Sequence, residues 1–137
     1  MIGIVIVTHR QLGDALIDTA AFILGAPPEA VVSVSVDLKD NAEKLRKKIA
    51  NGIKQVNQNE GILILTDMFG GTPSNLSYSF LEEGRVEVLS GVNLPILIKA
   101  TNTRNKMNIS ELARTLEDAG KKSISLASGI LKGNKRR

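Results

Sequence analysis

The sequence predicts an α/β domain with a central parallel sheet of four strands flanked by helices. Short β-branched apolar runs alternate with stretches whose apolar residues recur at helical spacing, which is the pattern of βαβ units. Some runs are apolar without alternation, as expected for strands that are buried on both faces of a sheet. At 137 residues the chain has the length of one domain with a single core.

The first half of the chain contains two predicted strand–helix units. Ile2–Val7 is a β-branched run that predicts a buried strand. Residues 11–24 carry apolar side chains at helical spacing, and a glycine–proline cluster then stops this helix. Val31–Val36 alternates valine with serine and predicts the second strand. The second helix covers residues 40–57, with Asp40 as its N-terminal cap.

The second half predicts two more strands of the sheet. Gly61–Thr66 is apolar over most of its length and predicts a strand buried on both faces. Thr72 and Pro73 open the next helix, as its cap and its first helical residue, and Gly84 ends it. Val86–Leu89 predicts the fourth strand. The remaining predicted elements are a helix from Asn93, a helix from Ser110 to Gly120 and a short final strand at Ser123–Ala127.

Composition argues against several classes of function. The chain has no cysteine and one histidine, which rules out thiolate chemistry and argues against a zinc site. Aromatic residues make up 3%, too few for a surface that stacks on bases. The net charge of +4 resides in Lys132–Arg137, which we expect to be a solvated tail and not a nucleic-acid arm. Met1–Val7 is too short to span a membrane and lacks a basic flank, so we expect a cytoplasmic protein.

Two polar clusters follow predicted strands. Thr8-His9-Arg10 comes after the first strand, and the segment from Asp67 to Pro73 comes after the third. In the strand order 2-1-3-4, which we predict, strands one and three are neighbours. The two clusters then meet at the carboxyl ends of the strands, beside the point where the strand order reverses. Open α/β sheets bind their ligands at such points, so we expect the functional site there.

His9 and Asp67 are the candidate catalytic residues. A neutral imidazole is a good nucleophile near pH 7, and a carboxylate can fix its other nitrogen. Without Asp67 and the glycine loop nearby, His9 would be interpreted as an ordinary polar loop residue. Asp67 also stands where a response-regulator receiver carries its phosphoacceptor. A receiver needs an acidic pair after strand one, however, and this chain has Thr8-His9-Arg10 there.

Gly70, Gly71 and Thr72 are candidates for binding an anion. Glycines let main-chain N–H groups approach an anion closely, and unpaired amides at a helix N-terminus favour negative charge. Alone, the segment is equally typical of a glycine turn with a threonine cap. Arg10 is either a neighbour of the bound phosphate or a solvated loop charge. Met68-Phe69, if exposed, would offer a partner protein a hydrophobic contact.

The chain resembles the enzyme IIA domains of the mannose family of the phosphoenolpyruvate-dependent sugar phosphotransferase system. The resemblance extends to about Gly129, and its most specific part is the strand-one histidine together with a D-x-x-G-G-[ST]-P-x-N loop. The matching segments are Ile4–His9, Ala42-Glu43, Leu63–Asn75 and Ser90–Leu97.

The resemblance implies that His9 is phosphorylated through Nε2 by phospho-HPr and passes the phosphoryl group to a IIB component. Asp67 would accept a hydrogen bond from the other ring nitrogen, and Gly71 and Thr72 would hold the phosphoryl oxygens. No metal or cofactor is expected. The resemblance further suggests a homodimer in which the last strand crosses to the partner's sheet and runs antiparallel there. Contact with a membrane would be indirect, through a permease complex.

Residues 1–129 are accordingly predicted to form the phosphocarrier domain, followed by a basic, disordered tail at 130–137. We expect no fused IIB domain after this tail, so the acceptor would be a separate chain. Arg10 departs from the family pattern, in which a small residue, often glycine, commonly follows the histidine. A second function stays open: a regulatory phosphoprotein of the same fold that signals phosphoenolpyruvate supply without serving a transporter.

Overall fold

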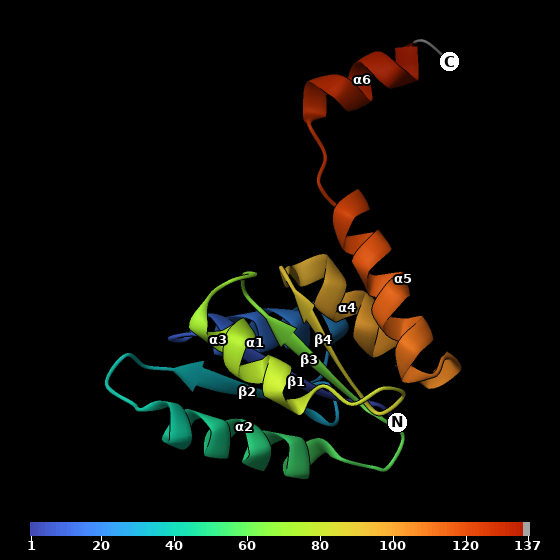
Figure 1. Ribbon diagram of the computed structural model, residues 1–137. Helices are drawn as coiled ribbons and strands as arrows, with labels where there is room; N and C mark the ends of the chain where they lie inside the picture. The colour runs from blue at the N-terminus through green and yellow to red at the C-terminus, as the bar shows by residue number, and fades with distance from the viewer. Residues whose placement is uncertain (136–137) are drawn as a thin grey trace.

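The computed structural model describes residues 1–135 and contains one parallel sheet with the predicted strand order β2-β1-β3-β4 (Figure 1). The two central strands are apolar and buried almost throughout, which suits a position between two layers of helices, whereas the two edge strands contain polar residues and are partly buried. The predicted sheet order is thereby confirmed. The strands are β1 (Gly3–His9), β2 (Val31–Val36), β3 (Ile62–Thr66) and β4 (Val86–Ser90).

The register of the sheet brings the carboxyl ends of β1 and β3 side by side. Val7 pairs with Thr66 at the end of the β1–β3 ladder, while His9 pairs with Val36 of β2. His9 is therefore the last residue of β1, and Asp67 directly follows the last residue of the neighbouring strand β3. The strand order reverses at β1, so this edge is the expected place for a ligand site.

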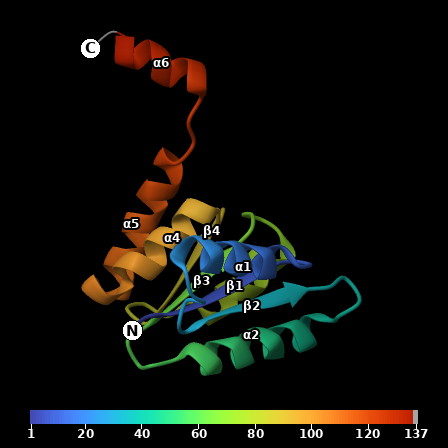
Figure 2. The same ribbon diagram turned by 180° about the vertical axis from the view of Figure 1, so that it is seen from behind.

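Helices cover both faces of the sheet (Figures 1 and 2). Side chains of β1 alternate between the faces: Ile4 and Ile6 pack with α1, α4 and α5, while Val5 and Val7 pack with α2 and α3. This alternation divides the core into two apolar clusters. The helices are α1 (Leu12–Leu24), α2 (Ala42–Val56), α3 (Thr72–Ser77), α4 (Leu94–Thr103) and α5 (Ile109–Lys122), with 3₁₀ turns at Tyr78–Phe80 and Arg104–Lys106.

Two helix caps differ from the prediction. Asn41, and not Asp40, caps α2, because its side chain accepts a hydrogen bond from the main-chain N–H of Lys44. Asp40 instead pairs with the ammonium groups of Lys44 and Lys48, at 3.1 and 2.6 Å. Gly71, and not Thr72, occupies the cap position of α3, so that helix starts without a side-chain cap.

The predicted strand at Ser123–Ala127 is not formed in the described part of the chain. Residues 124–126 have no regular structure, and Ala127–Lys135 form a further helix, α6, that stands apart from the sheet (Figure 1). A strand needs a neighbour for its main-chain hydrogen bonds, whereas a helix makes its own bonds locally. The predicted tail at 130–137 is therefore helical as far as Lys135, and residues 136 and 137 lie outside the described residues.

Candidate functional site

His9 and Asp67, which are 58 residues apart in the chain, are joined by two hydrogen bonds. Nδ1 of His9 lies 2.7 Å from Oδ2 of Asp67, and the main-chain N–H of His9 donates to the same oxygen at 2.9 Å. The imidazole is 41% exposed and the carboxylate 10% exposed. The strand ends thus place one ring nitrogen against a mostly buried carboxylate and leave the ring open to solvent.

The carboxylate of Asp67 is held in its ionised form. Burial raises the pKa of Asp67, but the hydrogen bonds from the main chain and ring of His9, the charge of His9 and the main-chain N–H of Met68 together outweigh burial and lower this pKa below its ordinary value. An ionised carboxylate can only accept hydrogen bonds, so Nδ1 of a neutral His9 carries the ring proton. The lone pair is then on Nε2, which has no hydrogen-bond partner among residues 1–135.

The loop between β3 and α3 closes against the histidine ring at Gly71. A methyl group on Gly71 would lie 3.1 Å from Cε1 of His9 and 3.4 Å from Cγ of Met68, closer than most side chains tolerate. Gly70 has a φ of 85°, a left-handed conformation that glycine adopts without strain. Both glycines therefore have a steric reason to be present.

Ser74 fixes the shape of this loop, and the sequence analysis missed it. Its buried hydroxyl accepts from the main-chain N–H of Gly70 at 3.1 Å and donates to the carbonyl of Gly71 at 3.0 Å. The amide of Gly70 is therefore already engaged. A serine in the first turn of a helix often bonds to the main chain nearby, and this signal was present in the sequence.

Thr8 has the same kind of role in the turn between β1 and α1, and it too was not singled out. Its buried hydroxyl accepts from the main-chain N–H of Gly13 at 2.8 Å, which fixes the start of α1. Arg10 and Gln11 connect the strand to this helix. Arg10 is exposed and has a φ of 50°, and Gln11 makes no side-chain cap.

The predicted site residues therefore separate into two groups. Asp67 is hydrogen-bonded to His9, and Gly71 lies against the ring of His9, where a Cβ would come within 3.1 Å of Cε1. Gly70 and Thr72 flank Gly71 in the same loop and are exposed. Thr72 makes no side-chain hydrogen bond among the described residues, and its predicted role as helix cap is wrong.

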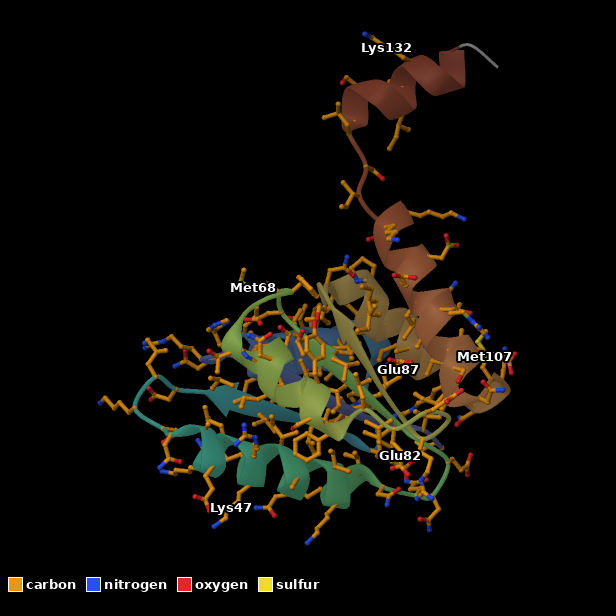
Figure 3. All side chains as sticks on the ribbon, in the orientation of Figure 1. Lys47, Met68, Glu82, Glu87, Met107 and Lys132 are labelled. Atoms are coloured by element: carbon orange, nitrogen blue, oxygen red, sulfur yellow. The ribbon has the colours of Figure 1, made fainter. Side chains whose placement is uncertain are left out.

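Exposed apolar side chains lie beside the histidine on the β3–α3 loop. Met68, labelled in Figure 3, and Phe69 are both exposed, and the Phe69 side chain is 78% exposed. The Phe69 ring lies 6.3 Å from that of Tyr78 and is tilted by 48° against it. Together these two side chains offer apolar surface that a partner protein could cover.

The fold and the histidine–carboxylate pair define an α/β domain with an oriented imidazole at the carboxyl edge of its sheet. A family model described as "PTS system fructose IIA component" matches residues 3–117. The chain belongs to this family of IIA components of the sugar phosphotransferase system, in agreement with the mannose-type resemblance seen in the sequence.

Individual relatives agree with this assignment. The chain is 29% identical over 129 residues to a fructose-specific EIIA component of Bacillus subtilis, covering 93% of this chain and 88% of that protein. It is 30% identical over 125 residues to a mannose-specific EIIAB component of Escherichia coli, covering 90% of this chain but 38% of that protein. A crystal structure of an EIIA component from Streptococcus agalactiae superposes with a TM-score of 0.84 at 27% identity, covering 94% of this chain and 99% of that one.

None of the helices in residues 1–135 combines the length and the apolar character required to cross a bilayer.

Proposed function

We propose that this chain is a phosphoryl carrier that accepts a phosphoryl group on Nε2 of His9 from phospho-HPr and passes it to a IIB component. The observation that carries the proposal is the bond between Nδ1 of His9 and the ionised Asp67, which leaves the lone pair of Nε2 free on an accessible ring. Family membership supports the coarser role of phosphoryl carrier in the sugar phosphotransferase system.

In the proposed exchange, the phosphoryl group moves from a nitrogen of the donor protein to Nε2 of His9. The lone pair of Nε2 attacks phosphorus, the N–P bond in the donor breaks, and its electron pair returns to the donor nitrogen. As the new N–P bond forms, positive charge grows on the ring of His9. The carboxylate of Asp67, at 2.7 Å from Nδ1, stabilises that charge and keeps the ring oriented.

The phosphoryl oxygens would be held by the main-chain N–H groups of Gly71 and Thr72. Neither amide donates a hydrogen bond within the described part of the chain, whereas that of Gly70 is engaged by Ser74. Gly70 therefore contributes to this cradle through its backbone conformation. These amides would also offset the repulsion between the phosphoryl group and Asp67. Arg10 belongs to the same proposed site.

The exposed surface around His9 is suited to contact with HPr and with a IIB component. Transfer between two proteins requires the donor to cover the surface around His9, and Met68 and Phe69 offer it apolar contact there. We place this exchange in the cytoplasm, with the phosphocarrier domain at residues 1–129 and any membrane contact made through a permease complex.

A homodimer is part of the same proposal. The segment after α5 carries apolar side chains in solvent, with Ile124 84% and Leu126 75% exposed. β4 lies at the edge of the sheet with unpaired main-chain groups. In a dimer, the segment around 123–127 would pair antiparallel with the partner's sheet. Light scattering at micromolar concentration should give twice the monomer mass, and a monomeric mass would reject this arrangement.

The deciding experiment is incubation with phosphoenolpyruvate, enzyme I and HPr, followed by mass spectrometry. We expect one phosphoryl group, acid-labile, on His9, and none on His9→Ala. Labelling of His9→Ala, with an acyl-phosphate product, would reject the phosphohistidine and revive a receiver-like role for Asp67.

A further inference from the structure

Arg10 is held in a backbone conformation that its side chain does not favour. It is one of three non-glycine residues with positive φ in the described chain, at 50°. For a residue with a Cβ this conformation is strained, whereas glycine would adopt it freely. The main-chain N–H of Arg10 donates to the carbonyl of Val36 at 3.1 Å, so neighbouring β2 fixes the residue in place. Strain of this kind persists where the surrounding structure imposes it, and it is concentrated at functional sites.

The side chain of Arg10 is available for a ligand. It is exposed, and it forms no ion pair within residues 1–135. The carboxylate of the site, that of Asp67, receives hydrogen bonds from His9 and Met68. A guanidinium offers several donors in a planar fork that matches the oxygens of a phosphoryl group.

We infer that Arg10 binds the phosphoryl group once it is on His9 and thereby sets how firmly this chain retains it. The inference rests on the proposed function and adds a specific role to it. Phosphorylation adds negative charge to that of the ionised Asp67, whereas Arg10 keeps its positive charge in both states. Its attraction therefore stabilises phospho-His9 relative to the free histidine, which shifts the transfer equilibrium toward the loaded chain.

This effect can be measured without a protein donor. N-phosphoimidazole exchanges its phosphoryl group with a histidine: the N–P bond of the reagent breaks, a new bond forms at Nε2 of His9, and imidazole leaves. The equilibrium constant for this exchange reports the retention of the phosphoryl group by the chain alone. A parallel measurement against phospho-HPr reports the same quantity with the proposed donor.

Three variants separate charge from backbone. Arg10→Gly and Arg10→Asn remove the charge and both tolerate positive φ, whereas Arg10→Lys keeps the charge. Arg46→Asn is the matched control, since Arg46 is an exposed arginine on α2. We expect Arg10→Gly and Arg10→Asn to lower the equilibrium constant about three- to tenfold, the effect of one partly solvated charge pair. The equilibrium constant should fall less in Arg10→Lys, and the constant of Arg46→Asn should equal that of the unmodified chain.

Salt supplies the second readout. A charge effect at an exposed site should shrink strongly in about 1 M salt, where the Debye length is about 3 Å. Equal constants for the unmodified chain, Arg10→Gly and Arg10→Asn would overturn the inference, and so would a difference that salt leaves unchanged. If HPr fails to label any variant while the N-phosphoimidazole constants still differ, the proposed partner is wrong and the role of Arg10 stands.

Discussion

The edge of the sheet that carries His9 and the segment that follows α5 meet solvent in opposite ways. At the first, the polar groups of His9 and Asp67 bond to each other, and the loops around them are fixed by buried hydroxyls. At the second, the apolar side chains Ile124 and Leu126 are exposed, and α6 stands apart from the sheet. The polar groups of the first region find their partners within one chain, whereas the apolar side chains of the second lie in solvent, where the proposed dimer would cover them.

Replacing Asp67 by alanine should have the largest effect and would test whether the first region acts as a unit. His9 remains present in this variant but loses the bond that fixes its tautomer and supports charge on the ring. Loss of such an electrostatic contact typically costs on the order of 10²–10³ in rate. Rapid-quench transfer from labelled phospho-HPr measures it. Labelling at the full rate would remove Asp67 from the mechanism.

Gly71→Ala should have a smaller effect on the same region. The added methyl group would lie 3.1 Å from Cε1 of His9, so either the ring or the loop must shift by a few tenths of an ångström. A displacement of this kind should slow transfer about tenfold, because a shift of 1 Å can cost about 10²-fold. Gly25→Ala is a control for the transfer rate, because it places a side chain at a φ of 86° at the end of α1 and so introduces backbone strain away from the His9 loop. A transfer rate in Gly71→Ala equal to that of the unmodified chain would show that the loop does not position the ring.

Acid should weaken the first region through Asp67. Because its pKa is lowered in the folded state, the folded chain binds this proton less readily than the unfolded chain does. The resulting stabilisation is complete above the ordinary pKa of 3.8 and is lost as the pH falls through the lowered value. Urea unfolding of the unmodified chain and of Asp67→Asn at pH 7, 4 and 3 should therefore show a difference that shrinks on acidification. A difference that stays constant would show that Asp67 does not couple folding to pH.

The double substitution Ile124→Ser and Leu126→Ser should have the smallest effect on the monomer and would test the second region. Both side chains are exposed, so the free energy of unfolding of the monomer should change by less than about 0.5 kcal/mol. The mass by light scattering should nevertheless fall to that of a monomer if the segment forms the dimer interface. A large loss of monomer stability would show that the segment packs on its own domain.

The sequence predicted the fold wherever an element finds its partner in the same chain. β1 and β3 are apolar because they are buried on both faces, so the strand order and the pairing of His9 with Asp67 followed from topology. The predicted cap of α2 was wrong by one residue. Aspartate and asparagine are both good N-terminal caps, so the sequence alone does not distinguish Asp40 from Asn41, and the local backbone conformation selects Asn41. The final strand was predicted at Ser123–Ala127, where the described part of the chain offers no strand to pair with; the proposed dimer would supply one.

The double use of Asp67 Oδ2 ties the chemistry of the site to the integrity of the sheet. This one oxygen accepts a hydrogen bond from the main-chain N–H of His9 and another from Nδ1 of its ring. A fluctuation that separates the ends of β1 and β3 therefore breaks both bonds together. Hydrogen exchange at the amide of His9 would therefore measure how often this strand edge opens, and each opening also releases the imidazole. The free energy of this local opening sets an upper limit on the fraction of time for which the ring is aligned for transfer.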